Sequence, residues 1–560
     1  MGQTFSNLQR KSIRDALQAK RLDVLVIGGG ATGAGILLDA TVRGMNVALV
    51  DMQDFAAGTS SRSTKLVHGG LRYLKQFEIR LVAEVGKERA IVYENGPHVT
   101  APEWMLLPIV KGGTYGKIAS SIGIRLYDYL AGVKKSERRQ MLTLRETLEA
   151  EPLLNSEILK GAGRYVEYRT DDARLTLEII KEAVNRGGLA LNYTKVTKLL
   201  YENRKVIGAE VFDVLTEKTY PIYARKVINA TGPWVDSLRE LDHSKEGKTL
   251  HLTKGVHIVV DSFKFPLKGP VYFDVPDGRM IFAVPRDGKV YIGTTDTNYK
   301  QDLAHPRMTK EDLQYLVAAT NYMFPSLKLV DEDVESSWAG VRPLIHEEGK
   351  GPSEISRKDE IFHADSGLIT IAGGKLTGYR KMAEHVINLV GEELAHESGR
   401  AYPPCTTDSV VISGGHVEGG KGFTNFVARH VKSGVELGLT AEEATRLVRR
   451  YGSNIGAIFE IVKLRREEAI AAGLEPSVFA ALRYGVDHEM VYSPEDFFTR
   501  RTSSTYFRID WARQWKSAVT HYLGQTFGWD AVEEARQLTN FEERLEEATN
   551  PVDVGARREN

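Results

Sequence analysis

The sequence predicts an α/β fold in which a parallel sheet is interrupted by an antiparallel β-rich segment and followed by an all-α region. Three observations predict this organisation. An apolar strand at residues 23–27 runs into a glycine-rich turn and then a helix. Strand-like runs between residues 256 and 294 are separated by tight-turn sequences. Helical patterns dominate from residue 403 onward.

Length and composition allow several cores and limit the choice of partners. The chain has 560 residues, which at roughly 150 residues per domain corresponds to about two to four domains. Lys plus Arg and Asp plus Glu both number 74, so no basic excess is available to hold nucleic acid. The single cysteine, Cys405, excludes an intramolecular disulfide and a thiolate-clustered metal site, and it suits a reducing, cytoplasmic compartment. No spacing typical of metal ligands is found.

The first 20 residues predict a basic amphipathic helix. Phe5, Leu8, Ile13 and Leu17 are interspersed with Arg and Lys. Such a helix can lie on a membrane surface, but docking on its own domain is commoner, and we favour docking. No run approaches the roughly 20 apolar residues that a membrane-spanning helix requires.

A βαβ unit with a glycine fingerprint follows. Residues 28–33 (GGGATG) join the strand at 23–27 to a helix at 34–43, and a second strand at 46–50 ends in Asp51. The glycine run fits the pattern G-x-G-x-x-G between a strand and a helix, with an acidic residue at the end of the next strand. Together these features predict a dinucleotide-binding site.

Each fingerprint residue has a physical role in such a site. Gly28 permits a sharp turn, and Gly30 lets the backbone approach a pyrophosphate at the helix N-terminus. Gly33 lets the helix pack closely on the strand. Asp51 stands where a carboxylate accepts hydrogen bonds from an adenosine ribose.

The fingerprint alone does not distinguish NAD from FAD, but the loop at residues 58–65 (GTSSRSTK) bears on the choice. Its N–H groups and hydroxyls can bind a second stretch of phosphate or a ribityl chain, which an NAD site does not need. A solvated polar turn is the alternative interpretation. The candidate cofactor contacts in this loop are Thr59, Ser60, Ser61, Ser63 and Lys65.

Two further junctions lie far along the chain. The strand at 226–229 runs into Ala230 and Gly232, where small residues allow backbone to pass close to a cofactor. The strand at 368–372 runs into a glycine-rich turn that opens a helix, which directs N–H dipoles and a lysine at one point. The candidate cofactor contacts at this second junction are Gly373, Gly374, Lys375, Leu376 and Thr377.

Taken together, these motifs resemble those of the FAD-dependent glycerol-3-phosphate dehydrogenases, in the D-amino-acid-oxidase-like flavoprotein superfamily. The resemblance covers roughly residues 20 to 400 and continues more loosely beyond. Leu37 departs from the Ala that the first family signature usually has, which bears on local helix packing. The matching stretches are residues 27–35, 39, 43–44, 61–74, 168–175, 373–375, 379–380 and 383.

The resemblance implies an FAD-binding Rossmann-like domain with an inserted antiparallel β-rich substrate (cap) domain and a C-terminal all-α domain. It places an N-terminal helix at 1–20, the oxidoreductase region at 21–400 and the helical domain at 401–560. Within the oxidoreductase region, FAD-binding segments at about 21–90, 165–250 and 335–400 alternate with cap segments at about 91–164 and 251–334.

The resemblance also implies an activity: oxidation of sn-glycerol 3-phosphate to dihydroxyacetone phosphate by hydride transfer to FAD. Electrons would pass to a membrane quinone from a protein attached peripherally to the cytoplasmic membrane face. The alternatives are an oxidase that uses O2, and an amine or amino-acid oxidase of the same fold. A flavin-binding RNA-modification or assembly protein is a different class, and the neutral charge disfavours it. The helical domain provides homodimer contacts, membrane and quinone access, or plain packing.

A small phosphorylated substrate requires cations, and its oxidation requires a base. Arg342, together with Arg62 or Arg357, is the predicted phosphate clamp, because an arginine fork matches phosphate oxygens. His257 is the first choice for the base and His68 the second, with a structural histidine as the alternative for each.

Two lysines complete the candidate catalytic set. Lys375 would contact the substrate and stabilise a flavin anion or a nascent alkoxide. Lys254 is also a candidate, although the two-residue strand period directs Lys254 and His257 to opposite faces unless the strand bulges near Gly255. The candidate catalytic residues are therefore His257, His68, Lys375 and Lys254.

Overall fold

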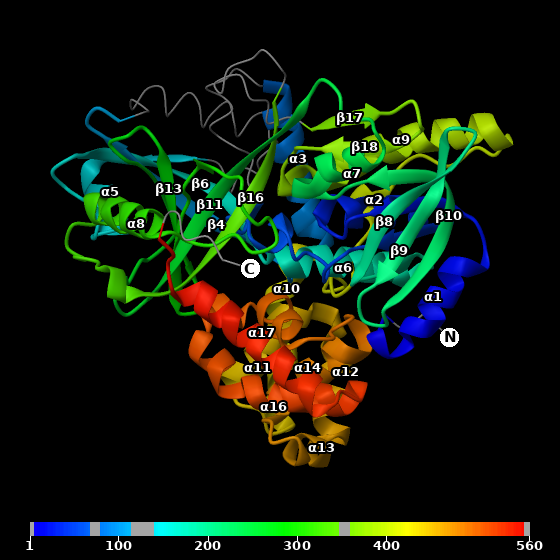
Figure 1. The fold of residues 1–560 in the computed structure, drawn as a ribbon. Coiled ribbons are helices and arrows are strands. Elements are labelled where there is room, and N and C mark those ends of the chain that lie inside the picture. The colour runs from blue at the N-terminus through cyan, green and yellow to red at the C-terminus, as the bar shows by residue number, and fades with distance from the viewer. Residues whose placement is uncertain (1–4, 68–78, 114–138, 347–358, 554–560) are drawn as a thin grey trace.

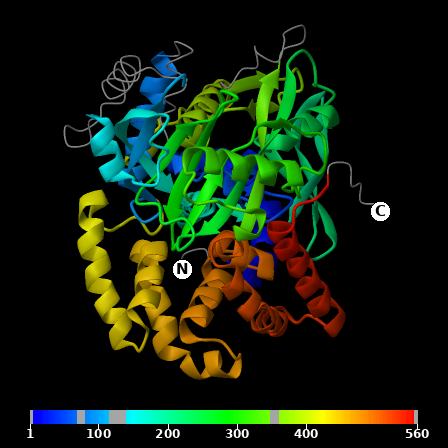
Figure 2. The same ribbon diagram turned by 90° about the vertical axis from the view of Figure 1, so that its left-hand side faces the viewer.

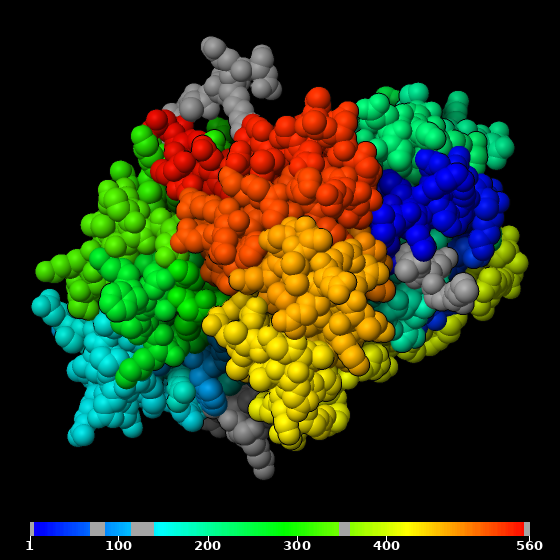
Figure 3. Space-filling view, turned by 90° about the horizontal axis from the view of Figure 1, so that it is seen from below, coloured from blue at the N-terminus to red at the C-terminus, as the bar shows by residue number. Residues whose placement is uncertain are grey.

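The computed structural model describes residues 5–67, 79–113, 139–346 and 359–553. Two sheets lie side by side, and a group of helices lies below both of them (Figures 1 and 2). The helices extend across one face of the molecule, from the second sheet to the N-terminal helix (Figure 3).

The first sheet contains the predicted βαβ unit and has eight strands. β1 (Leu22–Ile27) is fully buried and pairs in parallel with β2 (Val47–Val50) and with β10 (Lys218–Asn229). Parallel pairing also joins β10 to β18 (Ile369–Ala372) and β2 to β7 (Leu189–Leu191). The remaining strands pair in antiparallel fashion and are β8 (Thr194–Glu202), β9 (Lys205–Asp213) and β17 (Glu360–His363).

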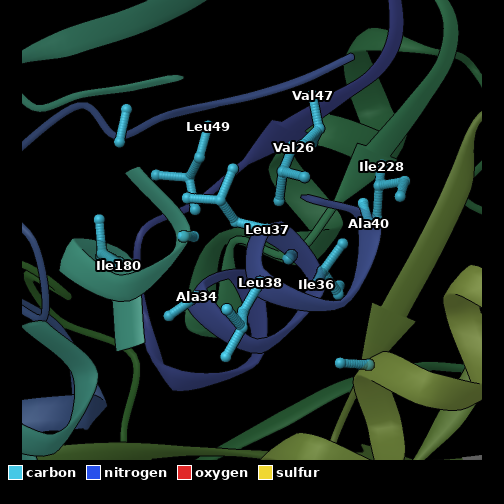
Figure 4. Packing of buried hydrophobic residues seen from close by; sticks show 14 of the residues in the cluster. Val26, Ala34, Ile36, Leu37, Leu38, Ala40, Val47, Leu49, Ile180 and Ile228 are labelled. Carbon is cyan, nitrogen blue, oxygen red and sulfur yellow. The ribbon is translucent and has the colours of Figure 1, made fainter. Parts of the chain in front are cut away.

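Helices α2 (Ala31–Val42), α6 (Asp172–Asn185) and α9 (Tyr379–Ser398) pack together beside the first sheet. α2 is buried on nearly every side, because it packs against strands as well as against α6 and α9. Its small and aliphatic residues meet Val26 of β1 and Leu49 of β2 (Figure 4). This packing fixes the N-terminus of α2 at the end of β1.

The second sheet has ten strands and is almost wholly antiparallel. The predicted hairpins are confirmed: β12 (Val271–Asp274), β13 (Met280–Arg286) and β14 (Lys289–Gly293) pair in succession. β11 (Thr249–Asp261) pairs with β14 and, along its whole length, with β16. The other strands are β3 (Leu66–Val67), β4 (Thr100–Val110), β5 (Gln140–Leu142), β6 (Leu159–Thr170), β15 (Thr297–Asn298) and β16 (Val334–His346).

Two predicted segment boundaries differ from these sheets. β16 belongs to the second sheet because it pairs with β11, so residues 334–346 lie with the cap rather than with the FAD-binding segments. β6 likewise continues in the second sheet to Thr170, five residues beyond the expected boundary at 165. The helices associated with these sheets are α3 (Ile79–Asn95), α5 (Leu144–Ala150), α7 (Val235–Leu241) and α8 (Lys310–Met323).

The C-terminal region is helical, as predicted. Thr440 and Glu443 form a capping box at the start of α11. A π-helix at Asp496–Arg501 precedes α15, and the helical core extends to Trp338 and Tyr291 of the second sheet. The helices are α10 (Gly419–Glu436), α11 (Ala441–Tyr451), α12 (Ile455–Leu464), α13 (Arg466–Ala471), α14 (Pro476–His488), α15 (Ser504–Phe507), α16 (Ile509–Phe527) and α17 (Ala531–Thr549).

The N-terminal helix α1 (Arg10–Ala19) docks on its own chain. Leu17 is fully buried, and the guanidinium of Arg10 donates hydrogen bonds to Asp213 and to the backbone of Asn192. The amphipathic pattern therefore serves intramolecular packing. Within the described ranges, we find no helix whose length and apolar character would let it cross a membrane.

Candidate active site

A cavity of about 400 Å³ lies where the two sheets meet. One wall is formed by loops that follow strands of the first sheet, and the other by strands of the second. The predicted site residues in its lining are Gly30, Thr59, Ser60, Arg62, Ser63, Ala230, Gly232, His257, Arg342, Gly373, Gly374, Lys375, Leu376 and Thr377. The fold thus brings together predicted residues from six separate segments of the sequence.

The glycine loop has the predicted geometry. Gly28 has φ +113°, and a Cβ there would lie 2.5 Å from the carbonyl oxygen of Ala230. A Cβ on Gly33 would lie 1.9 Å from the carbonyl oxygen of Gly28, so only glycine allows α2 to begin this close to β1. These two residues shape the turn from beneath, and Gly30 faces the cavity.

Asp51 holds the same loop. Its carboxylate accepts hydrogen bonds from the backbone N–H of Gly29 at 2.6 Å and of Gln53 at 2.8 Å. Burial raises the pKa of Asp51 to about 6. Each oxygen retains a second lone pair that can accept from a ribose hydroxyl. Asp51 lies beyond the lined cavity, at the end of β2.

The hydroxyl-rich loop is tied to both walls. The hydroxyl of Ser60 accepts from the N–H of Ala31 at the start of α2, and that of Thr59 donates to the carbonyl of Val341 in β16. Ser63 donates through its N–H and hydroxyl to Asp172. The loop is therefore a fixed part of the cavity wall rather than a solvated turn.

Ser61 and Lys65, both predicted cofactor contacts, lie beneath this loop and outside the cavity lining. The ammonium group of Lys65 is buried, pairs with Asp172 at 2.7 Å and donates to the carbonyl of Ser61. It also lies 5.1 Å from the centre of the Trp338 ring. With its charge balanced by Asp172, Lys65 supports the loop from outside the cavity.

The second glycine junction supplies another helix start. Gly373 and Gly374 both have positive φ angles, +76° and +79°, and Lys375 stands at the N-cap position of the short helix that leads into α9, without a side-chain capping bond. All three residues line the cavity. Arg380, one turn further, is turned away and pairs with Glu88.

His257 is the buried histidine of the cavity wall. Its Nε2 lies 3.1 Å from the hydroxyl of Thr64, and its ring stacks on Trp338 with centroids 4.8 Å apart. Nδ1 has no hydrogen-bond partner among the described residues. Burial, followed by the charges of Arg342 and Lys65, lowers the pKa of His257 well below its ordinary value. The imidazole is therefore neutral near pH 7, which leaves one ring nitrogen unprotonated.

Arg342 reaches the cavity from β16, where it is opposite Thr253 of β11. Its guanidinium donates to the hydroxyl of Thr294 at 2.9 Å and pairs with Asp296 at 3.1 Å. A Cβ on Gly255 would lie 2.3 Å from this guanidinium, so the glycine provides the space for it. These contacts direct the arginine fork at the cavity.

Arg62 is the second cation of this wall. Its guanidinium donates to the carbonyl of Ala304 at 2.8 Å, and its backbone packs against Gly340. Arg62 and Arg342 thus enter from a first-sheet loop and a second-sheet strand. The two guanidinium groups can bind an anion. The neutral imidazole beside them can accept a proton from that anion.

Lys254, predicted as a catalytic residue, lies outside the cavity lining. The strand alternation holds without a bulge near Gly255: Gly255 and His257 face the cavity, whereas Lys254 faces α8. There it pairs with Asp312 at 2.5 Å and donates to the carbonyl of Arg307. His68 and Arg357 lie outside the described residues.

Several lining residues were missed by sequence reasoning. Tyr272 and Phe282 come from the predicted hairpin strands and stack with ring centroids 4.0 Å apart. Strand alternation could have identified their face. The run 294–296 (TTD) directly follows β14, and it carries the same hydroxyl-rich signal as residues 58–65. The other missed lining residues include Thr64, Tyr165, Glu167 and Arg279.

The donor set of the lining suits FAD. The start of α2 and the Ser60 loop provide N–H and hydroxyl donors suited to a pyrophosphate and a ribityl chain. Glycine at positions 28 and 33 allows the tight turn that presents these donors, because a Cβ at either residue would collide with a backbone oxygen. Asp51, directly after β2, would accept hydrogen bonds from the adenosine ribose.

Comparisons with known proteins agree with this geometry. Residues 23–380 match the family described as FAD dependent oxidoreductase, and residues 405–534 match the C-terminal domain of alpha-glycerophosphate oxidase. The chain is 57% identical to the aerobic glycerol-3-phosphate dehydrogenase of Bacillus subtilis, over 99% of this chain and 100% of that protein. It is 54% identical to the enzyme of the same name from Staphylococcus haemolyticus, covering 97% and 98%.

Solved structures show the same relationship. The glycerol-3-phosphate dehydrogenase of Bacillus halodurans, complexed with FAD, is 52% identical, with a TM-score of 0.85 and coverage of 98% of this chain and 99% of that one. The L-alpha-glycerophosphate oxidase of Mycoplasma pneumoniae shares the fold at 20% identity and a TM-score of 0.54, covering 66% and 95%.

Proposed function

The chain belongs to the FAD-dependent oxidoreductase family, and from this premise we propose that it oxidises sn-glycerol 3-phosphate to dihydroxyacetone phosphate. The main support for this proposal is that Arg342 and the neutral His257 line the same cavity as the loops that suit FAD. The names of relatives more than half identical over nearly the whole chain support the same substrate.

The first-sheet loops would hold the cofactor. The start of α2 suits the pyrophosphate, Asp51 the ribose, and the hydroxyls of Thr59, Ser60 and Ser63 the polar linker. The two small-residue junctions, at 230–232 and 373–377, would pack against the remainder. When bound, FAD supplies an acceptor for the hydride that leaves the substrate carbon.

The remaining lining would bind and deprotonate the substrate. Arg342, oriented by Asp296, binds the phosphate together with Arg62. His257 accepts the hydroxyl proton at Nε2, the nitrogen nearest Thr64, because burial keeps the imidazole neutral. Lys375 contributes positive charge beside the reacting groups. His68 as an alternative base, and Arg357 as a further clamp residue, stay predictions.

The proposed electron acceptor is a membrane quinone, which requires at least transient attachment to the cytoplasmic membrane face. The match of residues 405–534 to an oxidase domain supports a second candidate, reduction of O2 to peroxide. Oxygen uptake and quinone-analogue reduction, measured on the same preparation, separate the two. A homodimer built through the helical domain is a further prediction, to be tested by light scattering.

The substrate assignment is tested by mixing the holoenzyme anaerobically with glycerol 3-phosphate and following the absorbance of oxidised flavin. We expect bleaching with this compound and none with glycerol, glycine or proline. Bleaching by an amino acid but not by glycerol 3-phosphate would instead identify an amino-acid oxidase.

A further inference from the structure

A second, larger cleft of about 950 Å³ lies between the helical domain and the second sheet. It is lined by the start of β4, the β13–β14 turn, α11 and the start of α16. None of its lining residues belongs to the cavity described above. The proposed function leaves this cleft without a role.

The charges in this cleft are unbalanced. Its lining has eight Arg and Lys side chains and five carboxylates. Each carboxylate is already paired with a cation, as in Asp171 with Arg286 and Glu335 with Lys289. The other three pairs are Asp287–Arg286, Glu442–Arg446 and Asp510–Arg513.

Three arginines of the cleft have no carboxylate partner among the described residues. Arg449, Arg450 and Arg508 form no ion pair with any residue in the described part of the chain. Arg450 donates to the carbonyl of Thr502, and the guanidinium of Arg508 lies 4.8 Å from the centre of the Trp511 ring. Arg450 and Arg508 are partly buried, so water screens their mutual repulsion incompletely.

Two further observations point to an anion. Burial, together with the charges of Arg446 and Arg450, lowers the pKa of Arg508 to about 10. The N-terminus of α16, which has no capping side chain, opens into the same cleft at Ile509. A helix start contributes partial positive charge and unpaired N–H groups to the three guanidinium groups.

We propose that this cleft is a second anion site, which binds a phosphate group between Arg450 and Arg508. Guanidinium forks match phosphate oxygens in pairs, and two of them from different helices can grip one group. A phosphate bound there would join α11 to α16 and draw the helical domain toward the β13–β14 turn. The ligand is a soluble phosphorylated compound or a phosphomonoester headgroup.

The test is calorimetric titration of the FAD-loaded protein with inorganic phosphate, with thermal unfolding measured in parallel. We expect two phosphate sites, because the proposed substrate cavity also takes phosphate. Arg508→Gln and Arg450→Gln should remove one site, with roughly tenfold or greater weakening, and should abolish its share of the phosphate-induced stabilisation. Arg342→Gln should remove only the other site, which separates this inference from the proposed function.

Controls address folding and general charge effects. Arg449→Gln affects an exposed side chain, so it should fold normally and weaken phosphate binding severalfold. Arg536→Gln, on α17 and outside the cleft, removes the same charge and should bind phosphate as the wild type does. Unchanged affinity and stoichiometry in Arg508→Gln, Arg450→Gln and Arg449→Gln would overturn the proposal.

A vesicle co-sedimentation assay distinguishes a soluble phosphorylated ligand from a lipid headgroup. If the ligand is a lipid headgroup, the wild-type protein should sediment with phosphatidic acid vesicles but not with phosphatidylcholine vesicles. Arg508→Gln should then lose this sedimentation. Phosphate binding without vesicle binding would identify a soluble ligand.

Discussion

The guanidinium of Arg342 occupies the space in which a side chain at residue 255 would stand. A Cβ on Gly255 would lie 2.3 Å from the nearer nitrogen and 2.5 Å from the hydroxyl of Thr294, to which that nitrogen donates. The glycine therefore belongs to the proposed substrate clamp although it offers no functional group.

Gly255→Ala should displace Arg342 from the cavity. We expect KM for glycerol 3-phosphate to rise about tenfold, because a charged hydrogen bond contributes about 1.5–3 kcal/mol. Flavin content should stay the same. Gly269→Ala is the matched control, since its Cβ would meet no atom nearer than 3.7 Å. Equal KM values for the two variants would show that Arg342 can bind from another position.

Arg342→Ala removes the clamp directly. We expect KM to rise about 10- to 100-fold while the flavin spectrum is unchanged, because the lost contacts are with the substrate rather than the cofactor. Arg342→Lys should recover part of the loss, since lysine retains the charge without the fork. Arg186→Ala, on an exposed helix end, serves as the control. Unaltered kinetics in Arg342→Ala would remove this residue from the clamp.

His257→Gln should lower kcat about 100- to 10,000-fold with little change in flavin content, as expected for loss of a general base. Because the pKa of His257 is depressed, the acid limb of kcat/KM in the wild type should lie below pH 6.5. His251→Gln is the control on the same strand, where the ring bonds Asn298 away from the cavity. Stopped-flow flavin reduction measures both variants.

His98 should make stability depend on pH. Burial, with Arg174 and Lys181 nearby, lowers its pKa to about 3. Below pH 6.5, His98 is protonated in the unfolded chain but stays neutral in the folded protein. The free energy of unfolding therefore falls as the pH drops from 6.5 toward 3. The contribution lost at pH 5 is about 2 kcal/mol.

The measurement is the difference in Tm between pH 7 and pH 5. His98→Asn should reduce this difference relative to the wild type, whereas His521→Asn, an exposed histidine, should leave it unchanged. An undiminished difference in His98→Asn would assign the acid sensitivity to other groups.

Asp54→Asn should loosen the helical domain. The buried carboxylate of Asp54 pairs with Arg500 at 2.5 Å and Arg501 at 2.6 Å. The substitution would therefore remove the main counter-charge of Arg501 and one of the three carboxylates that pair with Arg500. Breaking such a buried pair typically destabilises by about 3–5 kcal/mol. Thermal unfolding should show this loss, while KM stays near its wild-type value. Asp15→Asn, which breaks an exposed pair with Lys11, should leave Tm unchanged.

Local rules predicted much of this fold and part of the site. The strand, glycine turn and helix of residues 22–42 follow from short-range sterics, so Gly28 and Gly33 could be assigned roles that the geometry confirms. Strand alternation also separated His257 from Lys254. Both arguments depend only on neighbours along the chain.

The remainder depends on partners far away in the sequence. Lys65 lies in a phosphate-like loop, but Asp172, 107 residues later, neutralises it beneath the surface. Lys254 is likewise taken by Asp312 of α8. The assignment of β16 to the second sheet rests on its long pairing with β11, which no local pattern reveals.

Trp338 joins all three parts of the molecule. Its ring stacks on His257, its indole N–H donates to the carbonyl of Ser63, and it packs against Tyr506 and Phe507 of the helical domain. The C-terminal helices therefore help to hold Trp338 against His257, the proposed base. Replacing the C-terminal helices with those of a distant homologue would therefore lower turnover, unless the replacement kept Tyr506 and Phe507 in contact with Trp338.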